Sequence, residues 1–254
     1  MGYSNNYFPL VKVIYPYIFI YIFISISLSS LTSLQRQGAG NQLYFRTNRG
    51  KSVPRLPGPP EMKVEPLKEK SRLMSNDSSS LRSMVYASFF GALTAVGAYI
   101  IIPLPPVPIT LQTLFLGLAG TLLGARLAAL SQVVYLLLGV IGLPVFAGGK
   151  AGLGVLFGPT GGYLIGFIAA AYLIGTLAAL KSSPGFLWLC FSITIGFAVL
   201  YLLGVVQLSI VARLSPLKAL AAGVLPFLPG DVVKILLTAW IARKLRDRLG
   251  GSLP

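Results

Sequence analysis

The stretch Phe186–Val211 reads FLWLCFSITIGFAVLYLLGVVQLSIV and contains no charged side chain. A helix needs about 20 mainly apolar residues to cross the hydrocarbon core of a bilayer, and this stretch exceeds that length. It therefore predicts a transmembrane helix. The rest of the chain must then be compatible with a membrane.

Five further apolar runs are long enough, or nearly so, to cross a membrane. The composition agrees with this interpretation, because 55% of the residues are hydrophobic and only 11% are charged. We predict an all-α integral membrane protein with six transmembrane helices; counts of five or seven fit less well. The further runs are residues 84–102, 109–124, 127–143, 161–180 and 232–245.

The first 80 residues differ from this membrane domain, which we place at residues 81–254. Residues 11–34 are apolar and rich in Ser, whereas residues 35–60 are basic and contain no acidic residue. The first segment reads as a signal sequence, a membrane anchor or sequence that is not translated, and the second is typical of an organelle transit peptide. We expect a largely disordered N-terminal extension. If it is a targeting signal, the host membrane is a plastid membrane rather than the plasma membrane.

The net charge of +15 does not predict a nucleic-acid partner, because no nucleic-acid motif accompanies it. Its distribution fits loops beside anionic membrane lipid. With six spans, both ends of the domain lie on one side, which the basic residues favour by seven to four. That bias places the ends in the cytoplasm or its organellar equivalent. The seven are Arg82, Arg126, Lys181, Arg243, Lys244, Arg246 and Arg248, and the four are Lys150, Arg213, Lys218 and Lys234.

The opposite side then carries three segments that are rich in Gly and Pro, at residues 103–108, 144–160 and 214–230. Irregular backbone at membrane depth is tolerated only where protein or water satisfies its polar groups. We therefore expect the three segments to converge around a cavity that opens on this side.

The chain has few of the groups that enzymes use. It contains no His, and its only Cys is Cys190 within an apolar run. The commonest general base and metal ligand is thus missing, as is any thiolate metal site. We predict no cofactor, no metal and no enzymatic activity, with a membrane enzyme as the alternative class.

Asp231 is the acidic residue with the clearest functional signal. It stands at the entrance to the last apolar run, and Lys234 follows three residues later on the same helix face. Ionisable residues in or near a span are functional candidates by default. We interpret the pair as a polar floor for a ligand. The alternative is that Asp231 caps its helix and Lys234 extends outward to the membrane surface.

Residues 146–163 read FAGGKAGLGVLFGPTGGY, with seven Gly and one charge. Glycine permits close approach of backbone to a ligand. The segment does not match a phosphate-binding loop, because Pro144 and Ala151 occupy positions that need Gly and Ser or Thr. The alternative is a flexible re-entrant loop without ligand contact. Within the second run, Gln112 is a further polar candidate, either for the ligand or for a neighbouring helix.

Ala87, Gly91 and Ala95 repeat every four residues along the first run. Small residues at this spacing let another helix approach closely. The stripe predicts either packing within the chain or docking of a partner membrane protein.

Several segments, taken in order, resemble the BioY family. They are PITLQTL at 108–114, RLAALSQVVYLLLG at 126–139, GLPVFAGG at 142–149, GPTGGY at 158–163 and LPFLPGDVVK at 225–234. The resemblance covers about residues 84–248. It implies a six-helix, biotin-binding S component of an energy-coupling-factor (ECF) transporter, with a site that opens to the non-cytoplasmic face.

The resemblance also implies roles for particular residues. Asp231 and Lys234 match the family's Asp and Lys in the biotin site. Lys150 and Tyr163 are the side chains of the Gly-rich segment that we assign to the same pocket. The stripe of Ala87, Gly91 and Ala95 corresponds to the surface that docks on the transmembrane coupling subunit.

We therefore predict a protein that binds biotin and mediates its uptake. It acts either as the substrate-capture subunit of an ECF transporter, with a coupling subunit and ATPases as partners, or alone. The chain itself carries no ATPase motif. Transport of another small vitamin is the alternative within the same class.

Overall fold

The computed structural model describes residues 65–249, with side chains from 81 to 248; our expectations for residues 1–64 lie outside this part of the chain. Six of the described helices have 12 or more residues, in agreement with the predicted all-α class and helix number. The elements are α2 (Glu65–Gly97), β1 (Ile101–Ile102), β2 (Ile109–Thr110), α3 (Gln112–Leu123), α4 (Ala125–Val140), the short 3₁₀ helix η1 (Leu153–Val155), α5 (Gly161–Ala179), α6 (Phe186–Val211), α7 (Pro216–Gly223) and α8 (Leu228–Leu249).

The described helices differ in how well they fit a bilayer. By length and apolar composition, α5 and α6 can each cross a membrane, and α7 with α8, bent by 53° at their break, form a third candidate span. The apolar helices α3 and α4 are shorter, with 12 and 16 residues. They are shorter than the predicted runs because α3 begins only at Gln112 and α4 ends at Val140. The joint between them at Gly124, with φ of 76°, agrees with the predicted break.

The predicted first and second runs are interrupted by a small hairpin. Helix α2 stops at Gly97, and Ile101–Ile102 pairs antiparallel with Ile109–Thr110. Four prolines lie between the two strands, and proline can neither donate a backbone hydrogen bond nor continue a helix. The hairpin therefore ends the first helix earlier and starts the second later than the apolar pattern predicts. The short helix α7 was not predicted.

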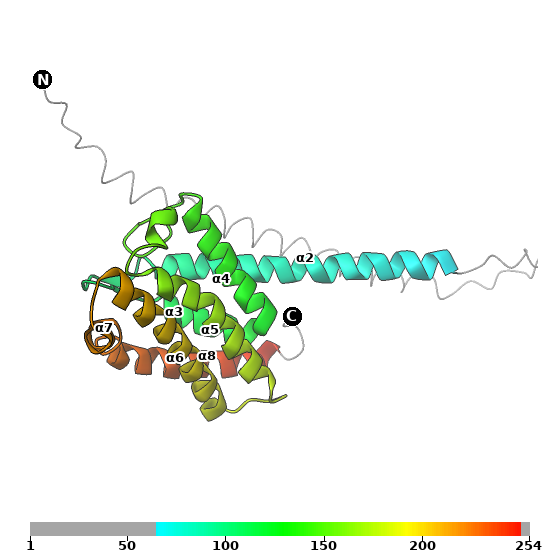
Figure 1. The fold of residues 1–254 in the computed structure, drawn as a ribbon. Helices are drawn as coiled ribbons and strands as arrows, with labels where there is room; N and C mark the ends of the chain where they lie inside the picture. Colours follow the sequence, from blue (N-terminus) through cyan, green and yellow to red (C-terminus); the bar gives the residue numbers. More distant parts are fainter. Residues whose placement is uncertain (1–64, 250–254) are drawn as a thin grey trace, which may run out of the picture.

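Helix α5 lies at the centre of the bundle. It packs most extensively along α6 and also against α3 and α4. A Cβ atom at Gly175 would lie 2.5 Å from the backbone nitrogen of Ala125, so only glycine allows α5 to approach the joint between α3 and α4. Figure 1 shows these helices gathered with α8, while α2 runs along the bundle and its first turns extend beyond it.

Helix α2 continues across the boundary that we predicted at residue 80. It is helical from Glu65, where we expected a largely disordered extension. Glu, Lys, Arg, Leu and Met are good helix formers, and they are frequent in residues 65–74. The division into an extension and a membrane domain stays a prediction.

The stripe of Ala87, Gly91 and Ala95 faces the interior of the chain. Ala87 and Ala95 are only 1% and 2% exposed, and a Cβ atom at Gly91 would lie 2.9 Å from the carbonyl oxygen of Ser131 on α4. Close packing of α2 on α4 therefore accounts for the small residues, as one of our two alternatives predicted. In this conformation the three residues are not available to a partner, and docking through them stays a prediction.

Candidate functional site

A pocket of about 670 Å³, a volume that includes the open solvent at its mouth, lies at the end of the bundle where α3, α5 and α8 begin. All three Gly- and Pro-rich segments contribute to its wall, through Val107 and Pro108, through residues 146–155, and through Phe227. The expected convergence of these segments on one cavity is thus observed.

The pocket brings together all five residues that we predicted to contact a ligand. Two of them come from α8, one from the start of α3, one from the Gly-rich segment and one from the first turn of α5. Their contact with a ligand stays a prediction. These residues are Asp231, Lys234, Gln112, Lys150 and Tyr163.

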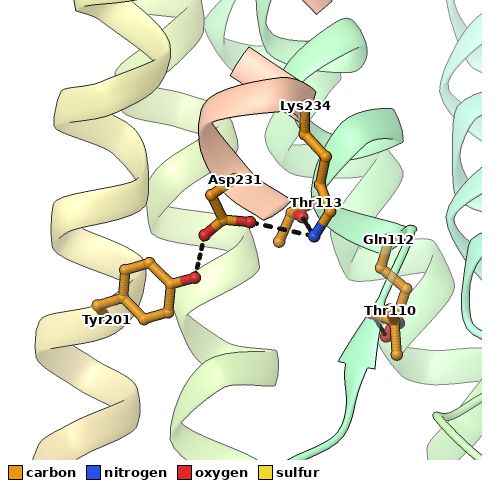
Figure 2. A network of polar contacts seen from close by, with 6 residues as sticks. All are labelled: Thr110, Gln112, Thr113, Tyr201, Asp231 and Lys234. Carbon is orange, nitrogen blue, oxygen red and sulfur yellow. Dashed lines mark hydrogen bonds and ion pairs between the residues drawn. The ribbon is translucent and has the colours of Figure 1, made fainter. Parts of the chain in front are cut away.

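An ion pair forms the polar floor of the pocket (Figure 2). The Nζ atom of Lys234 lies 3.0 Å from Oδ1 of Asp231 and donates a second hydrogen bond of 3.1 Å to Oγ1 of Thr113 on α3. The hydroxyl of Tyr201 on α6 donates to Oδ2 of Asp231. The floor therefore joins three helices that are far apart in the sequence.

Both charged groups are buried. Asp231 is 3% exposed and Lys234 is 8% exposed, so Lys234 turns into the protein instead of extending to the membrane surface. Two hydrogen bonds of the ammonium are used, and its third N–H has no partner within the described part of the chain. Each carboxylate oxygen has one protein donor and retains a lone pair. The pair thus presents one donor and one acceptor, side by side, to the pocket.

Gln112 lines the pocket and also bonds to neighbouring groups. Its Nε2 donates to the hydroxyl of Tyr135 on α4 at 2.5 Å, and its Oε1 accepts from Oγ1 of Thr110 at 2.9 Å. The hydroxyl of Tyr135 in turn donates to the carbonyl oxygen of Val145, at 3.2 Å. Gln112 therefore bonds to a neighbouring helix, as one of our two alternatives predicted. The same hydrogen bonds fix the orientation of its amide in the pocket wall.

Tyr163 forms part of the apolar wall. Its hydroxyl donates to the carbonyl oxygen of Gly223 on α7 at 2.9 Å, so the phenol is already engaged. Its ring lies against Gly204 on α6, where a Cβ atom would come within 2.4 Å of the ring carbons. The ring of Tyr163 also meets that of Tyr201 edge-on, with centroids 6.3 Å apart.

The Gly-rich segment is fixed to the bundle. Nε2 of Gln207 on α6 donates to the carbonyl oxygens of Leu156 and Gly158, at 2.6 and 2.9 Å. Phe146 and Lys150 bridge across a tight turn whose central residues, Gly148 and Gly149, have φ near +70°. Such φ values favour glycine. The turn presents the exposed Lys150 at the rim of the pocket.

Thr113 and Tyr201 also belong to the floor, although no sequence motif indicated either residue. A Tyr within a long apolar run has the pattern of an ordinary interior aromatic residue, and a Thr at the start of a helix has the pattern of a capping residue. Only the packing of α3 and α6 against α8 brings both hydroxyls to the ion pair. A polar side chain in the middle of a span is the one signal that was available for Tyr201.

A buried, hydrogen-bonded ion pair at the base of a pocket among apolar helices defines an integral membrane protein with an internal site for a small polar molecule. The comparisons with known proteins assign it further. The chain belongs to the BioY family, whose model matches residues 69–251. This membership confirms the resemblance that the sequence motifs indicated.

Individual relatives agree with the family. The biotin transporter BioY of Thermotoga maritima is 45% identical over 166 residues, which cover 65% of this chain and 96% of the relative. The biotin transporter BioY of Rhizobium etli is 38% identical over 174 residues, or 65% of this chain and 92% of the relative. A crystal structure of the S-component for biotin from an ECF-type ABC transporter matches with a TM-score of 0.62 and 31% identity, covering 66% of this chain and 93% of that one.

The ion pair makes a testable contribution to stability. Lys234→Met leaves the Asp231 carboxylate buried without its cation, which should cost about 3–5 kcal/mol. The double variant Asp231→Asn, Lys234→Met removes both charges and should be considerably more stable than the single variant. The unfolding temperature of the ligand-free protein in detergent measures both effects. If the losses of stability from Asp231→Asn alone and Lys234→Met alone simply add in the double variant, the two residues do not depend on each other.

Proposed function

We propose that this protein binds biotin in the pocket above Asp231 and Lys234 and carries it across the membrane. The observation that supports this most is the buried donor–acceptor pair within the pocket of a BioY-family chain. Relatives that match nearly their full length are named biotin transporters. Family membership favours this function over another vitamin and over enzymatic activity.

The chemistry of the floor suits the head group of biotin. The cyclic urea of biotin has an N–H beside its C=O, so it offers a donor next to an acceptor. The carboxylate of Asp231 accepts hydrogen bonds, and the ammonium of Lys234, 3.0 Å away, donates them. One edge of the urea can therefore meet both charged groups at once. Hydrogen bonds to charged groups are the stronger ones in proteins.

The remainder of biotin needs apolar surroundings. Its bicyclic ring and aliphatic chain suit the aromatic and aliphatic side chains that line the pocket between floor and rim. The amide of Gln112, whose orientation is fixed by Thr110 and Tyr135, supplies one polar group on this wall. Tyr163 supplies its ring, because its hydroxyl is bonded elsewhere. The apolar lining includes Val107, Phe146, Leu164, Phe167 and Leu200.

The carboxylate of biotin then lies toward the rim, where Lys150 is exposed. A cation at this position attracts the carboxylate without the desolvation that burial requires. The ends of the pocket thus differ: a buried pair recognises the head group, and a solvated cation meets the tail.

For the source of energy, we propose that the chain is the capture subunit of an ECF transporter and works with a coupling subunit and ATPases. The support is its likeness to the S-component of an ECF-type ABC transporter, together with the lack of an ATPase motif in the sequence. The opposing observation is that the stripe of Ala87, Gly91 and Ala95 packs on α4. Uptake by the chain alone is therefore the alternative.

The protein belongs in a membrane, and we propose the plasma membrane as its location. A plastid membrane is the alternative if residues 1–80 act as a targeting signal. The pocket opens at the end of the bundle opposite to the C-terminal turns of α8, which carry Arg243, Lys244, Arg246 and Arg248. With those basic residues in the cytoplasm, the mouth of the pocket faces outward.

Equilibrium binding of labelled biotin to the purified full-length protein in detergent tests the proposed site. We expect saturable binding, which Asp231→Asn and Lys234→Ala each weaken at least tenfold, or about 1.4 kcal/mol. Lys218→Ala is the matched control, because Lys218 is an exposed lysine on α7 outside the pocket. No binding by a folded sample would reject biotin as the ligand, and binding that both pocket variants retain would move the site elsewhere.

The proposed orientation of biotin is tested at Lys150. Lys150→Ala should weaken binding of biotin by about twofold to fivefold, the effect of an exposed ion pair worth ~0.5–1 kcal/mol. It should leave the binding of biotinamide unchanged, since the amide has no charge to lose. High salt should reduce the difference between the two ligands in the unaltered protein. An equal loss for both ligands would contradict the orientation.

The energy source is tested by accumulation of labelled biotin in bacterial cells that lack their own biotin uptake. We expect accumulation above the external concentration only when the chain is produced together with an ECF coupling subunit and its ATPases. Equal accumulation without these partners would show that the chain acts alone. Asp231→Asn, produced at the same level, provides the background.

A further inference from the structure

Tyr201 lies between two cavities. It lines the pocket described above, and it also lines a groove formed by α6, α7 and α8. The walls of the groove are almost entirely apolar, and Leu202 and Val232, at 63% and 57% exposure, lie open at its edge. On membrane-spanning helices, such a surface faces lipid.

Two residues, Tyr201 and Asp231, line both the pocket and the groove. The hydrogen bond from the Tyr201 hydroxyl to Oδ2 of Asp231 crosses the boundary between the two spaces, because it links α6 to α8 (Figure 2). The phenol of Tyr201 and the carboxylate that it holds therefore form part of the partition between the polar site and the lipid-facing groove.

Neighbouring rings fix the position of the phenol. The ring of Tyr201 meets Tyr163 edge-on and lies 6.1 Å from the ring of Phe227, centroid to centroid. Its hydroxyl therefore meets Asp231 from a set direction, while Lys234 holds the other carboxylate oxygen. With one donor on each oxygen, the plane of the carboxylate is determined. Without Tyr201, the carboxylate can turn so that both oxygens approach Lys234, and its free lone pair no longer points into the pocket.

We propose that Tyr201 is a positioning residue of the substrate site: its hydroxyl orients Asp231 toward the ligand, and its ring separates the pocket from the lipid-facing groove. The proposal rests on the proposed function, because biotin is the ligand whose binding depends on the orientation of Asp231. The hydroxyl acts through Asp231, whereas the ring acts by occupying space.

The two roles predict different results for two variants. Tyr201→Phe keeps the ring and removes the hydroxyl, so it should weaken biotin binding about tenfold. The same change made in an Asp231→Ala background should have no further effect, since the acceptor is gone. Tyr201→Ala should weaken binding more, and part of its loss should persist in the Asp231→Ala background, because the wall is then open. Tyr172→Phe, on an exposed tyrosine of α5, is the control for removal of a hydroxyl.

The measurement is equilibrium binding of labelled biotin to each purified full-length variant in detergent, with biotin raised high enough to saturate the weak binders. If Asp231→Ala does not fold, Asp231→Asn takes its place, and the effect of Tyr201→Phe should shrink instead of vanishing. A Tyr201→Phe protein that binds as tightly as wild type would overturn the proposal. So would an equal loss from Tyr201→Phe with and without Asp231.

If the proposed function is wrong, the wild-type protein itself does not bind biotin. The same set of variants then tests the contact between Tyr201 and Asp231 through the unfolding temperature of the ligand-free protein. A loss from Tyr201→Phe that disappears when Asp231 is absent supports the positioning contact. Losses that add would overturn it.

Discussion

Placing an ion pair inside a bundle of apolar helices is the constraint on which the rest of the structure depends. Taking a carboxylate and an ammonium out of water costs several kcal/mol for each ion, and their attraction offsets this only when their geometry is good and further hydrogen bonds satisfy them. Asp231 and Lys234 meet this condition through hydroxyls from two other helices, Tyr201 of α6 and Thr113 of α3. The positions of α3, α6 and α8 are therefore coupled to the charges of the site.

The elements around the pair shape the pocket into which it opens. The hairpin starts α3 at Gln112, which places Thr113 in the first turn, within hydrogen-bond distance of Lys234. The Gly-rich segment forms part of the pocket wall, and Gln207 holds it against α6. Polar groups in this region face the pocket or one another, and the outer surfaces of α5 and α6 remain apolar. The bundle can thus hold a polar ligand inside while its exterior stays apolar toward the membrane.

Much of this arrangement could be predicted, and the limits have physical reasons. Residues Phe186–Val211 predict a transmembrane helix because the run is long, apolar and uncharged. The observed bounds of α6 agree with this prediction. Asp231 and Lys234 were identifiable because charges are rare near a span. Tyr201 was not, since its partner is 30 residues away on another helix. The direction of the α2 stripe was not predictable either, because spacing defines a face of a helix but not the neighbour that covers it.

The burial of Gly91 connects the small-residue stripe of α2 to the pocket. Gly91 packs beside the backbone nitrogen of Tyr135, at 3.6 Å from its ideal Cβ position, and the hydroxyl of Tyr135 accepts from Gln112 in the pocket wall. A membrane protein that engaged this face of α2 would compete with α4 for it, and the competition would reach the pocket through Tyr135. By thermodynamic reciprocity, whatever such a contact did to the affinity for ligand, the ligand would do to the affinity of the contact. Binding of the ligand and binding of the partner protein would then be linked by a single coupling free energy.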